Sequence, residues 1–297
     1  MLRFETKTDR LVGELTAPCG AVLLKMWATH LPERPVTPFF HHAHTRFEVT
    51  VINRGRGQYF TRKKVYPIEP GDVFVFSSGE EHYIRTIEPG GLDVMNLHFE
   101  PRFLGETFSE SFGDSGRVFC YFHDPDFESR VPADSAGVIR MHHAAMQREL
   151  EDKEEQYDLV IRSHLHLLLT ELLRHHGYRS AVLPHNDTLN LLAVYDYIDR
   201  HIEEKITLKE LASVAGFTPN YFSHKFKELN GASLWDYITT RRVERALGLI
   251  LSGERATMLE IALRCGFSNT VSFNKAFRKV KGCAPGAIRR DPGLLLH

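Results

Sequence analysis

The sequence predicts a two-domain α+β protein, with an N-terminal antiparallel β-barrel and a helical pair followed by an all-α C-terminal domain. Short β-branched and aromatic runs broken by Gly and Pro fill residues 1–120, whereas apolar residues recur at helical spacing from about residue 138 onward. The length of 297 residues also exceeds what a single hydrophobic core usually serves.

The expected domain boundaries follow these changes of pattern. We expect the barrel over residues 1–135, two helices over 136–176, a linker over 177–188 and the helical domain over 189–291. The linker assignment rests on the Gly, Pro and polar residues of GYRSAVLPHNDT. No apolar run is long enough to span a bilayer and the first residues lack the apolar stretch of a signal peptide, so we expect a cytoplasmic location and no membrane partner.

Charge is unevenly distributed along the chain although its net value is −1. Residues 189–297 carry sixteen Lys and Arg against eleven Asp and Glu, and residues 1–188 carry 21 against 27. The C-terminal part is therefore the better candidate for binding a polyanion such as nucleic acid.

An internal repeat dominates the C-terminal part. The segment TLKELASVAGF at 207–217 aligns with TMLEIALRCGF at 257–267, and two phenylalanines four residues apart follow each copy. Each copy predicts a capping box, a short apolar helix, a glycine turn and a second amphipathic helix. This order of elements is a helix-turn-helix unit. Between the copies, residues 233–251 predict one continuous helix.

The second helix of each unit is expected to bury its apolar residues, Phe222, Phe226 and Leu229 or Phe273, Phe277 and Val280. The outward side chains, which we expect to contact DNA, are Asn220, Tyr221, Ser223, His224 and Lys227 in the first unit and Thr270, Val271, Asn274, Lys275 and Arg278 in the second. Short hydrogen-bonding side chains come early and bases later, as expected for contact with base edges and then with phosphates. Two helical hairpins in an ordinary bundle are the simpler alternative.

The linking helix sets the spacing of the two units. Its nineteen residues span roughly 28 Å at about 1.5 Å per residue. This is close to the roughly 34 Å of one duplex turn, so we expect one chain to read successive major grooves of double-stranded DNA. Arg241, Arg242 and Arg245 on this helix either approach the DNA backbone or brace the two halves.

Residues 189–290 resemble the DNA-binding domain of the AraC/XylS family of bacterial regulators. The resemblance lies in GFTPNYFSHKFKELNG, in the linking helix and in ALRCGFSNTVSFNKAFRKVKGCAP. It implies a transcription regulator that forms a homodimer through the helices at about 138–176, and that contacts RNA polymerase if it is an activator. The apolar spacing of these helices is equally compatible with packing against the barrel. His224 and Lys275 stand where Arg is frequent in the family, so the preferred bases do not carry over.

Two segments of the N-terminal part resemble the two cupin motifs. The first, HHAHTRFEVTVINRG, contributes His42, His44 and Glu48, and the second, GDVFVFSSGEEH, contributes His82. The resemblance implies a cupin-like barrel in which these four side chains point into one cavity. Asn96 and His98 share one face of a predicted strand, and they either line the same cavity or belong to the ordinary barrel wall.

Three interpretations of this set stay open. As a transition-metal site, His42, His44, Glu48 and His82 imply a metal-dependent cupin enzyme fused to a helical domain. As a hydrogen-bonded barrel wall, they imply a constitutive DNA-binding protein. The favoured interpretation is a pocket for a small-molecule effector.

The family resemblance extends to its sugar-sensing branch, which implies a saccharide effector and control of carbohydrate-utilisation genes. The four cupin-motif side chains are then its hydrogen-bonding partners, and Trp27 or Tyr59 is a stacking face. No nucleophile motif, phosphate loop or dinucleotide fingerprint is present in the sequence. We therefore expect a regulator without a cofactor rather than an enzyme.

Overall fold

The computed structural model describes residues 8–16, 22–34, 46–61, 64–76, 80, 82–104, 128–176, 185–230, 232–252 and 255–290. For residues 8, 101, 102, 185–192 and 228–230 the description is limited to the backbone.

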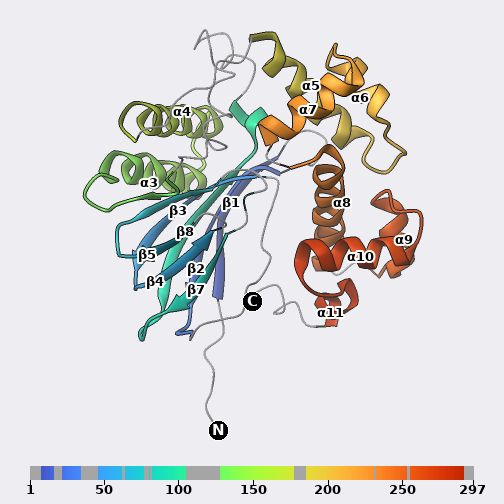
Figure 1. Ribbon diagram of the computed structural model, residues 1–297. Helices are drawn as coiled ribbons and strands as arrows, with labels where there is room; N and C mark the ends of the chain where they lie inside the picture. The colour runs from blue at the N-terminus through green and yellow to red at the C-terminus, as the bar shows by residue number, and fades with distance from the viewer. Residues whose placement is uncertain are drawn as a thin grey trace.

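Two antiparallel sheets form the N-terminal part, here called the β-domain (Figure 1). The larger sheet has the order β1-β2-β8-β3-β6-β9 and the smaller one β5-β4-β7. The strands are β1 (Thr8–Thr16), β2 (Val22–Leu31), β3 (Phe47–Arg54), β4 (Gly57–Thr61), β5 (Val65–Ile68), β6 (Val73–Phe76), β7 (His82–Ile87), β8 (Leu92–Phe99) and β9 (Arg130–Val131). A 3-10 helix, η1 (Pro101–Leu104), follows β8. Many short antiparallel strands were expected here, and the structure confirms them.

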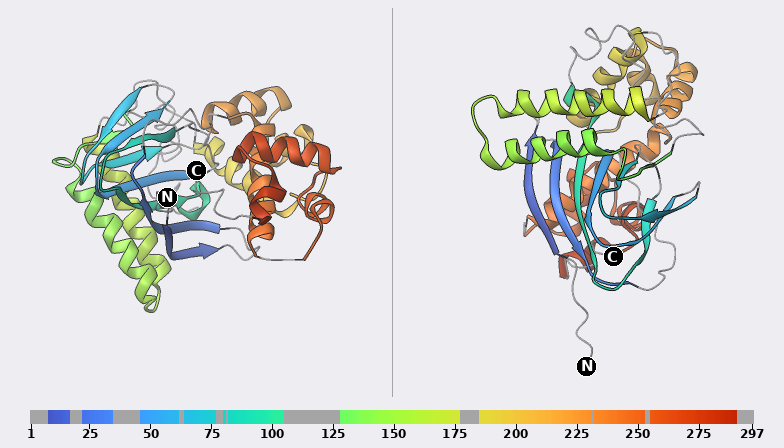
Figure 2. Two further views of the ribbon diagram at one scale, coloured as in Figure 1. Left: turned by 90° about the horizontal axis from the view of Figure 1, so that it is seen from below. Right: turned by 90° about the vertical axis from the view of Figure 1, so that its left-hand side faces the viewer.

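The larger sheet is covered by different elements on its two faces. Alternate residues of β3 and β8, such as Val49 and Leu97, pack with apolar side chains of α3 (Gly137–Asp152) and α4 (Tyr157–His175). The opposite face packs against the smaller sheet through residues such as Phe74 and Tyr59. Figure 2 shows α3 and α4 side by side across the larger sheet. The two expected helices are therefore present, and they have a packing role in addition to any role in dimerisation.

Seven helices make up the described C-terminal part: α5 (His185–Arg200), α6 (Leu208–Val214), α7 (Pro219–Asn230), α8 (Leu234–Leu251), α9 (Met258–Arg264), α10 (Thr270–Lys281) and α11 (Pro285–Arg290). Helix α8 begins after its cap Ser233 and ends at Leu251, as the sequence predicts. Helix α5 begins at His185, so residues 185–188, expected in the linker, are helical. The Asn-Asp-Thr run that suggested a loop is also favoured at a helix start, which explains the difference.

The helical domain contains two separate hydrophobic cores that share α8. The first core includes Phe222 and Phe226, and the second includes Phe273 and Phe277, all four fully buried. Helix α8 supplies residues near its start to the first core and residues near its end to the second. In the part of the chain described above, no helix has the length and apolar character that crossing a membrane requires.

Candidate functional site

Each helix-turn-helix unit begins with a reciprocal pair of hydrogen bonds. The Glu210 N–H donates to Thr207 Oγ1 at 3.3 Å, and the Thr207 N–H donates to Glu210 Oε2 at 2.8 Å. The Glu260 and Thr257 pair repeats this arrangement at 3.2 and 2.6 Å. At the start of each helix, α6 and α9, two backbone N–H groups that would otherwise lack a partner are hydrogen-bonded. Both expected capping boxes are therefore confirmed.

A glycine with positive φ makes the turn inside each unit. Gly216 has φ +67° and Gly266 has φ +79°, a region that L side chains rarely adopt. A Cβ at Gly266 would also lie 2.3 Å from the backbone oxygen of Ile202, so any larger residue is excluded there by contact as well as by conformation. The second helix of each unit, α7 or α10, follows this turn.

The outer faces of α7 and α10 carry the side chains expected to contact DNA. On α7, all five predicted residues are exposed: Asn220, Tyr221, Ser223, His224 and Lys227. On α10, Val271, Lys275 and Arg278 are exposed, with Val271 at 77%, whereas Thr270 and Asn274 are half-buried. The Asn274 side-chain amide donates to the Thr270 carbonyl at 2.8 Å, so one of its two N–H groups is engaged within the helix.

The opposite faces are buried largely as predicted. The four phenylalanines have no exposed surface, Val280 is half-buried against the second core, and the side chain of Leu229 lies outside the described residues. Each helix therefore presents a polar face on a rigid apolar support. The last turn carries Lys227 in α7 and three basic residues, Arg278, Lys279 and Lys281, in α10.

The three arginines of α8 brace the helical domain. Arg242 donates to the backbone oxygens of Ile202 at 3.0 Å and Glu204 at 2.6 Å, and Arg245 pairs with Glu203. Arg241 donates to both oxygens of Asp199 on α5 at 2.9 Å. The alternative that these arginines approach the DNA backbone is therefore not supported, because nearby oxygens already accept from them.

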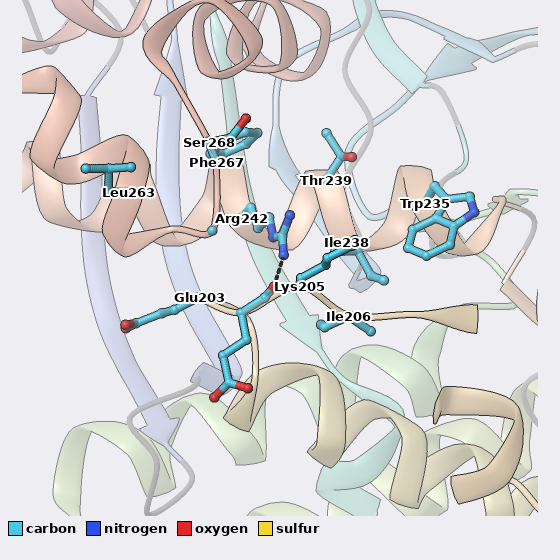
Figure 3. A pocket seen from close by; sticks show the side chains of 12 residues that line it. Glu203, Lys205, Ile206, Trp235, Ile238, Thr239, Arg242, Leu263, Phe267 and Ser268 are labelled. Atoms are coloured by element: carbon cyan, nitrogen blue, oxygen red, sulfur yellow. Dashed lines mark hydrogen bonds between the residues drawn. The ribbon is translucent and has the colours of Figure 1, made fainter. Parts of the chain in front are cut away.

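A hollow of about 440 Å³ separates the two helix-turn-helix units. Arg242 lines it together with Trp235, Leu263 and Phe267, and Figure 3 shows these side chains around the opening. Arg242 therefore holds the turn before α6 next to the turn of the second unit.

A buried carboxylate organises the polar side of the β-domain interior. Glu48 Oε2 lies 2.8 Å from Nε2 of His98 and 3.2 Å from Nε2 of His82. Glu48 and His82 are both buried, with side chains 6% and 3% exposed. Residues from the two separate motifs therefore meet in the β-domain interior.

This cluster continues as a row of hydrogen bonds across the sheet. The Thr50 hydroxyl lies within hydrogen-bond distance of Glu48 and, at 3.0 Å, of Asn96 Oδ1. The Asn96 side-chain amide donates to Thr29 at 3.1 Å, and the Thr29 hydroxyl donates to Asp9 at 2.6 Å. These residues belong to β1, β2, β3 and β8, so the row crosses four strands.

Electrostatics keep the cluster polar despite its burial. Burial lowers the pKa of His82, but the adjacent Glu48 carboxylate outweighs it, and the pKa lies above its ordinary value. Burial and the same carboxylate raise the pKa of Tyr59 well above 10, so this phenol stays protonated. An imidazole beside a carboxylate places a donor and an acceptor side by side.

The two aromatic candidates differ in how much of the ring is open. The Tyr59 ring is enclosed by Phe74 at 4.5 Å and Phe76 at 5.2 Å between ring centroids, and the residue is buried. Trp27 is half-buried and meets His98 edge-on at 4.5 Å. The Trp27 ring is therefore less enclosed than that of Tyr59.

His98 has a larger role than the sequence suggested, whereas the predicted His42 and His44 lie outside the described residues. The signal for His98 was its alternation with Asn96 in LDVMNLHF, which places both side chains on the inner face of β8. Among the described residues, no group of three or more His, Cys, Asp and Glu side chains is placed to hold a metal ion.

Family models match both parts of the chain. An AraC-like ligand binding domain matches residues 34–169, and a helix-turn-helix domain matches residues 211–291. The chain combines an AraC-like ligand binding domain with a helix-turn-helix domain. Helices α7 and α10 and the second capping box lie within the helix-turn-helix match, and the first capping box lies just before it. The Glu48 cluster lies within the other match.

Sequence relatives match most of the chain. The probable transcriptional regulator LumQ of Photobacterium leiognathi is 26% identical over 248 residues, 82% of this chain and 90% of that protein. An uncharacterized HTH-type transcriptional regulator of Staphylococcus aureus is also 26% identical over 247 residues, but the chain spans only 31% of its length. The two domains and the relatives are those of a transcriptional regulator.

Solved structures of ToxT from Vibrio cholerae share the fold. One structure matches with a TM-score of 0.62 and 10% identity over 92% of this chain and 98% of that one. ToxT bound to an unsaturated fatty acid matches with a TM-score of 0.56 and 12% identity over 90% and 95%. At this identity the likeness concerns the arrangement of elements alone.

Proposed function

We propose that this chain regulates transcription by binding duplex DNA through α7 and α10, and that a small molecule bound in the β-domain controls this binding. The observation that supports DNA binding is the repeated surface: each helix buries two phenylalanines and exposes polar and basic side chains on its other face. An ordinary bundle has no need to present the same polar face twice, once on each side of a long helix.

The test compares specific with non-specific DNA. Duplexes are selected from a random library by the full wild-type chain, and affinities of variants are then measured on the selected and on an unrelated duplex. His224→Ala and Asn274→Ala are expected to weaken binding to the selected duplex about tenfold, with a smaller loss on unrelated DNA, because base contacts carry the discrimination.

Lys227→Ala serves as the control for phosphate contact. It is expected to weaken binding to both duplexes similarly. The slope of log affinity against log salt concentration is expected to fall in magnitude by about one. Equal losses on both duplexes for His224→Ala and Asn274→Ala would mean that these faces do not read bases.

The proposed effector is a hydroxyl-rich molecule, with a saccharide as the first choice. The row from the buried Glu48 to the exposed Asp9 supplies carboxylate, imidazole, hydroxyl and amide groups, which are the kinds of partner that sugar hydroxyls bind. Trp27 beside His98 provides an apolar face of the kind that sugar rings pack against. Control of carbohydrate-utilisation genes belongs to the same proposal.

A panel of sugars scored by thermal unfolding tests this choice. A sugar at about 100 times its Kd is expected to stabilise the wild-type chain by about 2.7 kcal/mol, and Glu48→Gln is expected to lose most of this shift. Transition metals and a fatty acid are included in the panel. Stabilisation by Fe, Mn or Zn, abolished by a chelator, would favour the metal-dependent enzyme, and no shift with any compound would favour a constitutive DNA-binding protein.

Homodimerisation through α3 and α4 stays a prediction. Exposed apolar side chains on these helices support it: Val138, Met141, Leu159 and Leu167. Sedimentation equilibrium of the full chain decides between a monomer and a dimer. Contact with RNA polymerase and a cytoplasmic location also stay predictions of the same regulator.

A further inference from the structure

A buried cluster of charges joins the β-domain to the helical domain. Its centre is Arg241 of α8, whose guanidinium pairs with Glu100 of the β-domain as well as with Asp199 of α5. Glu244 lies 3.6 Å from Arg241 and 3.7 Å from Arg46 of the β-domain. The Arg241 and Glu100 side chains are 8% and 4% exposed.

The β-domain side of this cluster continues the polar row described above. Glu48 pairs with His98 across β3 and β8, and Arg46 and Glu100 lie two residues further along the same two chain segments. Because strand side chains alternate between faces, residues two apart point to the same side. Arg46 Nε and Glu100 Oε1 lie 3.7 Å apart, which agrees with both side chains pointing to the same side of the sheet. The polar row therefore runs from the interior cluster to the domain contact.

On the side of the helical domain, the cluster reaches α10, one of the two helices proposed to contact DNA. Lys281, the last residue of α10, is half-buried, and its charge interacts with Glu244 and Arg46. A lysine at this end of α10 is placed to contact a DNA phosphate if α10 enters a groove. In this structure the Lys281 side chain lies at the contact between the two domains instead.

We propose that the cluster of Arg46, Glu100, Asp199, Arg241 and Glu244 is a latch that holds the helical domain against the β-domain and weakens DNA binding while it is closed. This inference rests on the proposed function and names the contact through which the effector acts. A ligand that binds the Glu48 carboxylate in place of His98 would displace the His98 side chain. His98 lies near the end of β8, two residues before Glu100. Opening the latch frees Lys281 and allows α7 and α10 to adopt the orientation that DNA requires.

Glu100→Gln is the sharpest variant of the latch. It removes the charge of Glu100 with little change in shape, and Arg241 keeps its bidentate contact with Asp199, so no buried charge is left without a partner. The matched control is Glu69→Gln, which removes the same charge from the β-domain at the pair between Glu69 and Arg130, 3.6 Å apart and outside the latch. Arg46→Gln loosens the latch from the neighbouring segment and serves as the second variant.

The first readout needs no DNA and no effector. Small-angle X-ray scattering of the full chain at low salt is expected to show a larger radius of gyration for Glu100→Gln and Arg46→Gln than for wild type and Glu69→Gln. Circular dichroism melting shows whether each variant is folded. Folded Glu100→Gln and Arg46→Gln chains with the wild-type radius would overturn the latch whether or not the protein binds DNA.

The second readout is affinity for a duplex selected by the wild-type chain. Glu100→Gln is expected to bind it about fivefold more tightly, a usual size for coupling between two sites. The slope of log affinity against log salt is expected to steepen by about 0.9, the value for one added phosphate contact, and Lys281→Gln in the same chain should remove this increment. Unchanged or weaker binding by Glu100→Gln, or equal tightening by Glu69→Gln, would overturn the latch. A wild-type chain that selects no duplex contradicts the proposed function instead, and the scattering result still decides the latch.

Discussion

Replacing Phe277 with alanine is expected to cost about 3–5 kcal/mol, the usual range for truncating a fully buried aromatic side chain. Phe277 has no exposed surface and packs with Phe273, Ile261 and Val243 in the second core of the helical domain. This core is small and shares only α8 with the first one. The loss should therefore be concentrated in α9, α10 and α11, while the first helix-turn-helix unit keeps its structure.

Hydrogen exchange of the full chain measures where the stability is lost. In Phe277→Ala, amides of α9 to α11 should lose protection and those of α6 and α7 should keep it, and the DNA segment protected from nuclease should shorten toward one unit. Phe226→Ala, the equivalent change in the first core, should give the reverse pattern. Uniform loss of protection across the domain in both variants would show that the two cores unfold together.

Lowering the pH from 6.5 to 4 is expected to destabilise the β-domain by about 3 kcal/mol through His143 alone. His143 lies on α3 against the larger sheet, 2% exposed, and its Nε2 has no hydrogen-bond partner among the residues that the structure describes. Burial lowers its pKa to about 4. The unfolded chain binds a proton at this residue below about pH 6.5, whereas the folded chain does so only near pH 4, so stability falls as the pH falls through this window.

Urea unfolding of the wild-type chain and of His143→Gln at pH 7 and pH 5 measures this effect. The wild type should lose about 2 kcal/mol more than the variant between these two pH values, since the window is then partly crossed. His175→Gln, at an exposed position of α4, is the control and should behave as wild type. His82 acts in the opposite direction: its raised pKa gives stability that is complete below its ordinary pKa and is lost as the pH rises through the folded value. An equal loss of unfolding free energy in the wild type and in His143→Gln would show that His143 does not cause the loss of stability at low pH.

Local features of the fold were predictable because their causes lie within a few residues. The capping pairs Thr207–Glu210 and Thr257–Glu260, the glycine turns and the extent of α8 each follow from side chains that act on their own backbone. The burial of the paired phenylalanines follows from helical spacing alone. These features were confirmed almost residue by residue.

Contacts between distant segments were harder to predict. Arg241 and Glu100 are 141 residues apart in the chain, and their contact depends on how the two domains meet. No periodic pattern in the sequence indicates a contact of this kind. His98 was underestimated because the motif directed attention to His42 and His44, whereas strand pairing places His98 directly opposite Glu48. The start of α5 was placed too late because the residues that favour loops also favour helix starts.

The chemical character of the domain contact also bears on how safely the protein can change shape. Each hydrophobic cluster among the described residues lies wholly within one domain, and none extends across the contact made by Arg241 and Glu100. Separating the two domains at this contact therefore exposes charged groups to water. Water and salt readily compensate charged groups, whereas newly exposed apolar surface invites aggregation. If the latch opens as proposed, the described residues uncovered at this contact are charged, and charged surface does not promote aggregation as apolar surface does.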